Sequence, residues 1–112
     1  MQDFVFLKVE KSHVRVRFSE ILMVQADKKY VTVVTADRSF LTLSSMNHIE
    51  KMLPPDSFCR IHRSTMVNLD RVRALESGEE DETIVVLDGG ARLRMSRRYR
   101  KVLQERLGVR ER

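Results

Sequence analysis

Four polar side chains suited to holding anions gather within five positions in the second half of the chain. Arg60, His62, Arg63 and Ser64 stand inside the stretch FCRIHRSTMVNLDRV, residues 58–72. An Arg guanidinium is a planar fork of donors that fits phosphate oxygens or the O6/N7 edge of guanine, and a Ser hydroxyl can add a hydrogen bond to phosphate. The types and spacing of these residues predict a nucleic-acid contact.

Two further basic clusters stand at an expected loop and at an expected helix start. They are Asp27-Lys-Lys-Tyr30 and Arg97-Arg-Tyr-Arg-Lys101. Loops and helix starts can carry binding residues because a rigid sheet aims them without giving up its own hydrogen bonds. Any one such cluster is more often a solvated surface than a binding site. Three of them favour a binding surface, provided that the fold brings them to one side of the molecule.

The charge of the whole chain also favours an anionic partner. The 112 residues carry a formal net charge of +5 with a pI near 9.8, and Arg supplies 15 of the 21 basic side chains. Such an Arg excess suits geometric recognition of phosphate or guanine better than solubility alone requires. From charge alone, a basic protein with solvated side chains is an equal alternative.

The length and the hydrophobic content of 42% predict a single domain over residues 1–112 with a modest core. Cys59 is the only cysteine, so no intrachain disulfide can form. A reducing, cytoplasmic setting is therefore expected, with Cys59 as a small buried residue. No apolar run approaches about 18 residues and the first residues lack a basic segment, so neither membrane insertion nor export is expected.

Alternating and β-rich segments dominate the pattern and predict a mostly-β fold of about nine or ten short strands. In the first half, polar turns separate expected strands at 4–9, 14–18, 21–26, 30–35 and 40–43. In the second half, strands are expected at 59–62, 65–69, 71–75, 83–87 and 92–95, with a tight turn at 88–90.

One or two short helices complete the expected fold. Ser44 or Ser45 can cap a helix over 46–53 that the Pro54-Pro55 pair would end, and Ser96 can cap a helix over 97–107. The basic first turn of the second helix opposes the helix dipole, which indicates that its arginines serve a partner. The candidate packing residues of this helix are Tyr99, Val102, Leu103 and Leu107.

Two other classes of function are less well supported by the same residues. An enzyme could draw a metal set from His13, His48, Cys59 and His62, but these lack the spacing of a zinc motif. The sequence also holds no Gly-rich phosphate loop and no nucleophile elbow, so no catalytic residue, metal or cofactor is expected. A basic β-domain that binds RNA by stacking is the remaining alternative, with few aromatic residues for the stacking surface.

The stretch that begins at Phe58 resembles the core motif of the LytTR DNA-binding domains, Phe-x-Arg-(Ile/Val)-His-Arg-Ser followed closely by Val-Asn. The matching residues are Phe58, Arg60, Ile61, His62, Arg63, Ser64, Val67 and Asn68. Upstream, residues 21–31 resemble a second motif of that family, and residues 87–99 resemble its closing hairpin and helix start. The resemblance covers nearly all of residues 2–107.

The resemblance implies an elongated antiparallel β fold that lies along double-stranded DNA and puts loops into successive major grooves, usually at direct repeats in promoters. It also implies a bacterial transcription regulator, with a receiver domain common upstream and a second copy on the adjacent repeat. By position, the side chains expected to contact bases are Lys29, Tyr30, Arg63 and Arg97. Those expected to bind phosphate are Lys28, Arg60, Ser64, Arg98 and Arg100.

Some residues depart from the family's pattern. Met23-Val24 stands where an aromatic residue is frequent, Gln25 replaces a frequent acidic residue, and Thr65-Met66 replaces a bulkier pair. We expect these changes to repack the core without changing the fold. His62 and Asn68 are expected to serve the structure, Asn68 by satisfying backbone groups. The acidic segment 79–82 is expected to be an exposed loop that does not face DNA.

Overall fold

The computed structural model describes residues 2–109, so the two ends of the predicted domain, at residues 1 and 110–112, lie outside the described part. Within that part there are two α-helices, α1 (Met46–Met52) and α2 (Arg97–Leu107), and neither is long and apolar enough to cross a membrane. Three short 3-10 turns are η1 (Phe18–Glu20), η2 (Leu69–Arg71) and η3 (Glu79–Asp81). The strands are β1 (Phe4–Val9), β2 (Ser12–Arg17), β3 (Ile21–Ala26), β4 (Tyr30–Thr35), β5 (Ser39–Leu43), β6 (Phe58–His62), β7 (Thr65–Asn68), β8 (Val72–Ser77), β9 (Thr83–Leu87) and β10 (Arg92–Met95).

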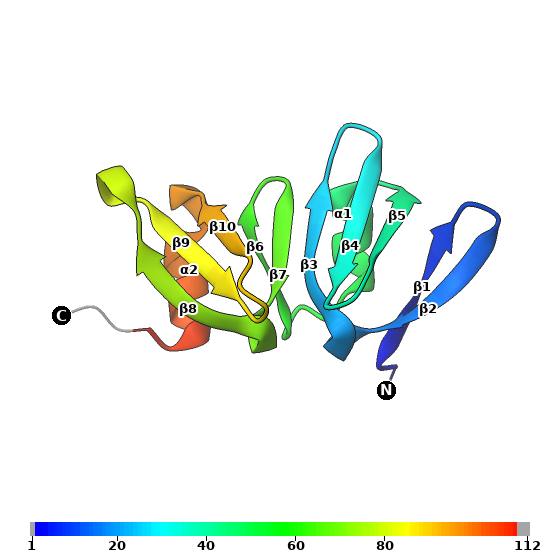
Figure 1. Ribbon diagram of the computed structural model, residues 1–112, viewed down its shortest axis with the longest axis horizontal. Coiled ribbons are helices and arrows are strands. Elements are labelled where there is room, and N and C mark those ends of the chain that lie inside the picture. Colours follow the sequence, from blue (N-terminus) through cyan, green and yellow to red (C-terminus); the bar gives the residue numbers. More distant parts are fainter. Residues whose placement is uncertain (1, 110–112) are drawn as a thin grey trace.

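The strands form antiparallel sheets that follow one another along the long axis of the molecule (Figure 1). β1 pairs with β2, the middle sheet has the order β5-β4-β3-β7-β6, and the last sheet has the order β10-β9-β8. The Cα atoms span 50 × 31 × 24 Å, so the molecule is elongated. The prediction of a mostly-β, antiparallel fold with short helices is confirmed.

The β6–β7 hairpin lies between the two apolar clusters of the molecule and packs against both of them. Phe58 and Met66 pack in one apolar cluster with α1, β1, β3 and β4, whereas Cys59, Ile61 and Val67 pack in a second cluster with β9, β10 and α2. All four residues of β7 are buried. Both faces of β7 are therefore covered, and its buried residues include the polar Thr65 and Asn68 as well as Met66 and Val67. The stretch from Phe58 therefore sits at the centre of the fold.

The two helix starts differ from each other in how they are capped. The Ser45 hydroxyl accepts the His48 N–H at 3.1 Å, which confirms one of the two candidate caps of α1. Ser96 is the N-cap residue of α2, which confirms the predicted position of the cap, but its side chain makes no cap hydrogen bond. The Ser96 backbone instead fixes the turn, since its N–H donates to the Ile61 carbonyl and its carbonyl accepts from the Tyr99 N–H.

The packing side of α2 was predicted correctly for Leu103 and incorrectly for Val102. Leu103 is fully buried and Leu107 packs beside the same cluster, whereas Val102 is 50% exposed. Residues four apart lie on one side of a helix, so Tyr99, Leu103 and Leu107 share a stripe that Val102 leaves by about 100°.

Asn68 closes the buried end of β7. It is 2% exposed, and its amide nitrogen donates to the carbonyls of Ile21 at 3.0 Å and Phe18 at 3.3 Å. Its amide oxygen accepts the Asp70 N–H at 3.0 Å. The expectation that Asn68 satisfies backbone groups is confirmed.

Replacing Asn68 with leucine should lower the free energy of unfolding by about 1 to 3 kcal/mol, because two carbonyls lose their donor. Urea denaturation measures the change. Gln25→Leu makes the same amide-to-leucine change at an exposed position of β3, and should shift stability by about 0.5 kcal/mol or less. If the two substitutions lower the free energy of unfolding equally, the hydrogen bonds of Asn68 do not contribute measurably to stability.

Candidate nucleic-acid interface

The three basic clusters lie on one long edge of the molecule, the upper edge in Figure 1. The β3–β4 loop, the β6–β7 turn and the start of α2 all reach this edge, one from each successive hairpin or helix. We call this surface the basic edge. It is formed by Lys28, Lys29, Arg63, Ser64, Arg97 and Arg98. The fold therefore brings the three basic clusters to one side of the molecule, which the sequence alone could not show.

The first loop of the basic edge is a short, closed turn. The Asp27 N–H donates to the Tyr30 carbonyl at 2.8 Å, and the Asp27 carboxylate accepts the Lys28 N–H at 2.7 Å. Lys28 and Lys29 are exposed, and neither makes an ion pair among the described residues. Tyr30 is half-exposed, and its ring lines a hollow beside Lys8 and Leu43. Lys29 therefore lies at the loop tip, with Tyr30 set back from it.

The second loop presents Arg63 at its tip. The Arg63 side chain is exposed, while its carbonyl accepts from the Arg60 guanidinium at 3.0 Å. The Ser64 N–H donates to His62 Nδ1 at 3.2 Å, and the Ser64 hydroxyl lies 2.9 Å from the same nitrogen. His62 Nδ1 acts as an acceptor here, which assigns the ring proton to Nε2. His62 thus holds the turn that displays Arg63, in line with the structural role expected for it.

The third site is the first turn of α2. Arg97 and Arg98 are exposed, and the Arg98 guanidinium lies 5.4 Å from the centre of the Tyr99 ring. A stacked guanidinium keeps its in-plane donors free for an acceptor. The N–H groups of the first helical turn add partial positive charge at the same place, and the Ser96 side chain does not occupy them.

Backbone hydrogen bonds lock the three sites to one another through the β6–β7 hairpin. On one side, the Ala26 N–H at the end of β3 donates to the Ser64 carbonyl at 2.8 Å. On the other side, the Ser96 N–H before α2 donates to the Ile61 carbonyl at 2.8 Å. The spacing of the three sites is therefore set by paired backbone and not by side-chain packing alone.

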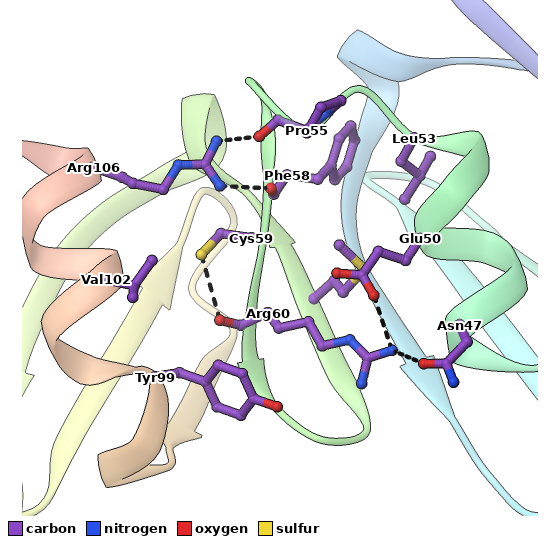
Figure 2. A pocket seen from close by; sticks show the side chains of 11 residues that line it. Asn47, Glu50, Leu53, Pro55, Phe58, Cys59, Arg60, Tyr99, Val102 and Arg106 are labelled. Carbon is purple, nitrogen blue, oxygen red and sulfur yellow. Dashed lines mark hydrogen bonds and ion pairs between the residues drawn. The ribbon is translucent and has the colours of Figure 1, made fainter.

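Arg60 lies behind the turn, and its guanidinium is engaged inside the protein. Figure 2 shows it reaching from β6 across a hollow of about 510 Å³ toward α1. It donates to the Asn47 amide oxygen at 2.6 Å and pairs with the Glu50 carboxylate at 3.1 Å, and its side chain is 15% exposed. The structure therefore gives Arg60 a role in holding α1 against the hairpin. Its predicted phosphate contact stays a prediction.

Two other features of the hollow in Figure 2 are structural. Arg106 of α2 donates to the carbonyls of Phe58, at 2.9 Å, and Pro55, which fixes the helix to the start of β6. Cys59 is buried beside it, and burial raises the pKa of its thiol despite the nearby Arg106 charge. A thiol with a raised pKa stays protonated and unreactive at neutral pH. Cys59 is the small buried residue that was predicted.

One basic residue on the same side was not singled out from the sequence. Lys11 is exposed in the β1–β2 turn, whose tip points the same way as the three basic loops (Figure 1). Its neighbour Glu10 adopts a left-handed backbone with φ of 55°. A single lysine beside a carboxylate gives no local charge excess, so only the fold could place it with the others.

Comparison with known proteins identifies the family. A model of the LytTr DNA-binding domain matches residues 11–108. The chain belongs to the LytTR DNA-binding domain family. Its fold superposes on a solved LytTr DNA-binding domain of a Bacillus cereus response regulator with a TM-score of 0.82 and 28% sequence identity, covering 96% of this chain and 99% of that one. The resemblance stated from the sequence is confirmed.

Curated relatives of this LytTR domain are longer proteins. The sensory transduction protein LytR of Staphylococcus epidermidis is 29% identical over 100 residues, which cover 89% of this chain and 39% of the relative. The sensory transduction protein LytT of Bacillus subtilis is 29% identical over 108 residues, or 96% of this chain and 45% of the relative. The chain thus spans less than half the length of these two relatives.

Proposed function

We propose that this LytTR domain binds double-stranded DNA at specific sequences through its basic edge, as the DNA-binding unit of a bacterial transcription regulator. The observation that carries the proposal is the hydrogen-bonded connection of three basic sites along one edge, through Ser64 and Ile61. Preorganised donors lose little conformational freedom when they bind, so they favour recognition of a duplex of fixed shape. Family membership agrees with this partner.

The dimensions of the molecule suit more than one groove. The long axis measures 50 Å between Cα atoms, whereas a helical turn of B-DNA rises about 34 Å. A molecule that lies along the duplex can therefore present loops to two successive major grooves on one side. A two-stranded hairpin also fits within a major groove, which is about 12 Å wide.

Base contacts are assigned to the tips of the three sites. Arg63 is the strongest candidate, because its backbone is fixed and its guanidinium is exposed. Lys29 and Arg97 are exposed at the other two sites, and Tyr30 is a candidate through its half-exposed ring. Guanine is the preferred partner of a bidentate arginine.

Phosphate contacts are assigned to the flanks. Lys28, Ser64 and Arg98 lie beside the proposed base contacts, and we add Lys11 as a contact at the outer end. Arg60 and Arg100 complete the set only if their present hydrogen bonds within the protein are exchanged for phosphate. Such contacts set orientation and affinity without selecting sequence.

The proposal also covers the domain organisation, the cellular compartment and the arrangement of DNA sites. Residues 1–112 would act as one unit in the cytoplasm, without a catalytic site, at direct repeats that place a second copy beside the first. In a regulator of the length of the curated relatives, a receiver domain would stand upstream. Exposed aromatic rings within residues 2–109 are Phe6 and Tyr30 alone, which disfavours the alternative of RNA binding by stacking.

Neutralisation of about five to eight phosphates should make log K fall with log salt at a slope of roughly −4 to −7. Fluorescence anisotropy of a labelled duplex at several salt concentrations measures the slope. Single-stranded RNA of equal length serves as the competitor. A slope near zero, or stronger binding to the RNA, would remove the support for a duplex partner.

A further inference from the structure

The acidic loop, residues 78–82, lies beside the third basic site. Figure 1 shows η3 at the same edge of the molecule as the start of α2. One hollow is lined jointly by Glu79 to Glu82 and by Arg94, Arg97 and Arg100. The sequence predicted an exposed loop that does not face DNA. The loop is exposed, yet its charges border the surface to which phosphate contacts are assigned.

Direct contacts join the loop to that site. Arg100 donates to the Asp81 carbonyl at 2.6 Å, and its guanidinium lies 3.9 Å from the Asp81 carboxylate. Arg94 of β10 pairs with the Glu82 carboxylate at 2.6 Å. The loop therefore already supplies a carbonyl and a carboxylate oxygen to Arg100 of α2, and a second carboxylate to Arg94 of β10.

The ion pair between Arg100 and the Asp81 carboxylate is weak enough to be exchanged. The Asp81 carboxylate is 79% exposed, and Arg100 Nε is buried without a hydrogen-bond partner among the described residues. The loop backbone is also strained, because Glu80 and Asp81 have φ of 49° and 68°, a region that residues other than glycine seldom adopt. An exposed carboxylate at 3.9 Å is a poorer partner for arginine than a phosphate that reaches it directly.

We propose that the acidic loop competes with DNA phosphate for the arginines at the start of α2. Because phosphate must displace the loop when the complex forms, the loop lowers the affinity of this LytTR domain for any duplex. The inference rests on the proposed function, because DNA is the competing anion. As a physical consequence, the carboxylates of the loop cancel part of the positive charge that would otherwise face DNA. Positive charge that the loop already compensates releases fewer counterions from DNA when the complex forms.

The test removes three of the four negative charges of the loop by amide substitutions of similar shape, in a variant with Glu79→Gln, Glu80→Gln and Asp81→Asn. The control variant, Glu20→Gln, Asp56→Asn and Asp70→Asn, removes the same charge from exposed residues in η1, η2 and the turn after α1, at the opposite edge (Figure 1). Both are compared with the wild type by anisotropy, on a selected duplex and on a scrambled duplex of equal length.

The loop variant should bind both duplexes about three- to tenfold more tightly, as expected for the loss of a few exposed charge interactions. Its salt slope should be steeper by about one unit. The control variant should gain less than about twofold, since exposed charges beyond a Debye length are screened. In a background with Arg97→Ala and Arg100→Ala, the gain of the loop variant should disappear.

Three results would overturn the inference alone. An equal gain in the loop and control variants, or a gain that persists without Arg97 and Arg100, would show that net charge acts at long range and that the contacts at the start of α2 do not matter. An unchanged affinity of the loop variant is the third. A wild-type protein that binds no duplex at all overturns the proposed function together with this inference.

Discussion

Replacing Arg63 with alanine is expected to weaken binding to the preferred site by about 1 to 3 kcal/mol and to affect unrelated DNA much less. The reason is the position of the side chain, exposed at the tip of a turn whose backbone Arg60 and His62 hold in place. A bidentate contact to guanine depends on that geometry and is lost with the guanidinium. Titration of matched preferred and scrambled duplexes at constant salt measures the difference.

Arg73→Ala provides the control for this change. Arg73 is exposed near the start of β8, away from the basic edge, so its removal lowers the net charge equally without touching a proposed contact. It should weaken both duplexes slightly and to the same degree. If Arg63→Ala behaves in that way too, Arg63 contacts only the DNA backbone, and base recognition lies elsewhere.

The second large effect concerns the helix that carries the third basic site. Leu103→Ala should lower the free energy of unfolding by about 2 to 5 kcal/mol, because a fully buried side chain leaves a cavity between α2, β6 and β9. Thermal and urea denaturation measure the loss. Since α2 packs through this residue, DNA binding at moderate temperature should weaken in parallel with the loss of folded protein.

Val102→Ala is the matched control on the same helix. Val102 is half-exposed, so its truncation should change stability by about 0.5 kcal/mol or less. A large loss of stability in Val102→Ala with little loss in Leu103→Ala would mean that α2 is rotated relative to this structure. The same result would move Arg97 and Arg98 away from the basic edge.

Local patterns in the sequence were sufficient for most of the fold. Alternation in β2 and the β-rich runs of β3 and β4 predict their strands to within two residues, because each pattern reflects which face is buried. The turn at Gly89 and Gly90 was predicted from residues that tolerate positive φ, which both glycines adopt. Such signals are local, so a single sequence contains them.

Relationships between distant residues were not available from the sequence. Arg60 and Arg63 are the same residue type in the same basic stretch, so the sequence does not distinguish their roles. In the fold, the Arg60 side chain contacts Asn47 and Glu50, whereas the Arg63 side chain is exposed. The Ser96 backbone is held by Ile61, a contact over 35 positions that no local propensity encodes. The family resemblance supplied the expected residues, and only the fold showed which of them share an edge.

Hydroxyl-radical footprinting of a duplex recovered from a random DNA pool tests the central claim most directly. If the basic edge is the interface, protection should fall on one side of the duplex in two or three short windows, separated by about one helical turn of 10 to 10.5 base pairs. Lys29→Ala, Arg63→Ala and Arg97→Ala should each weaken a different window. A single window, or the same loss in every window from all three variants, would contradict an interface built from three separate sites.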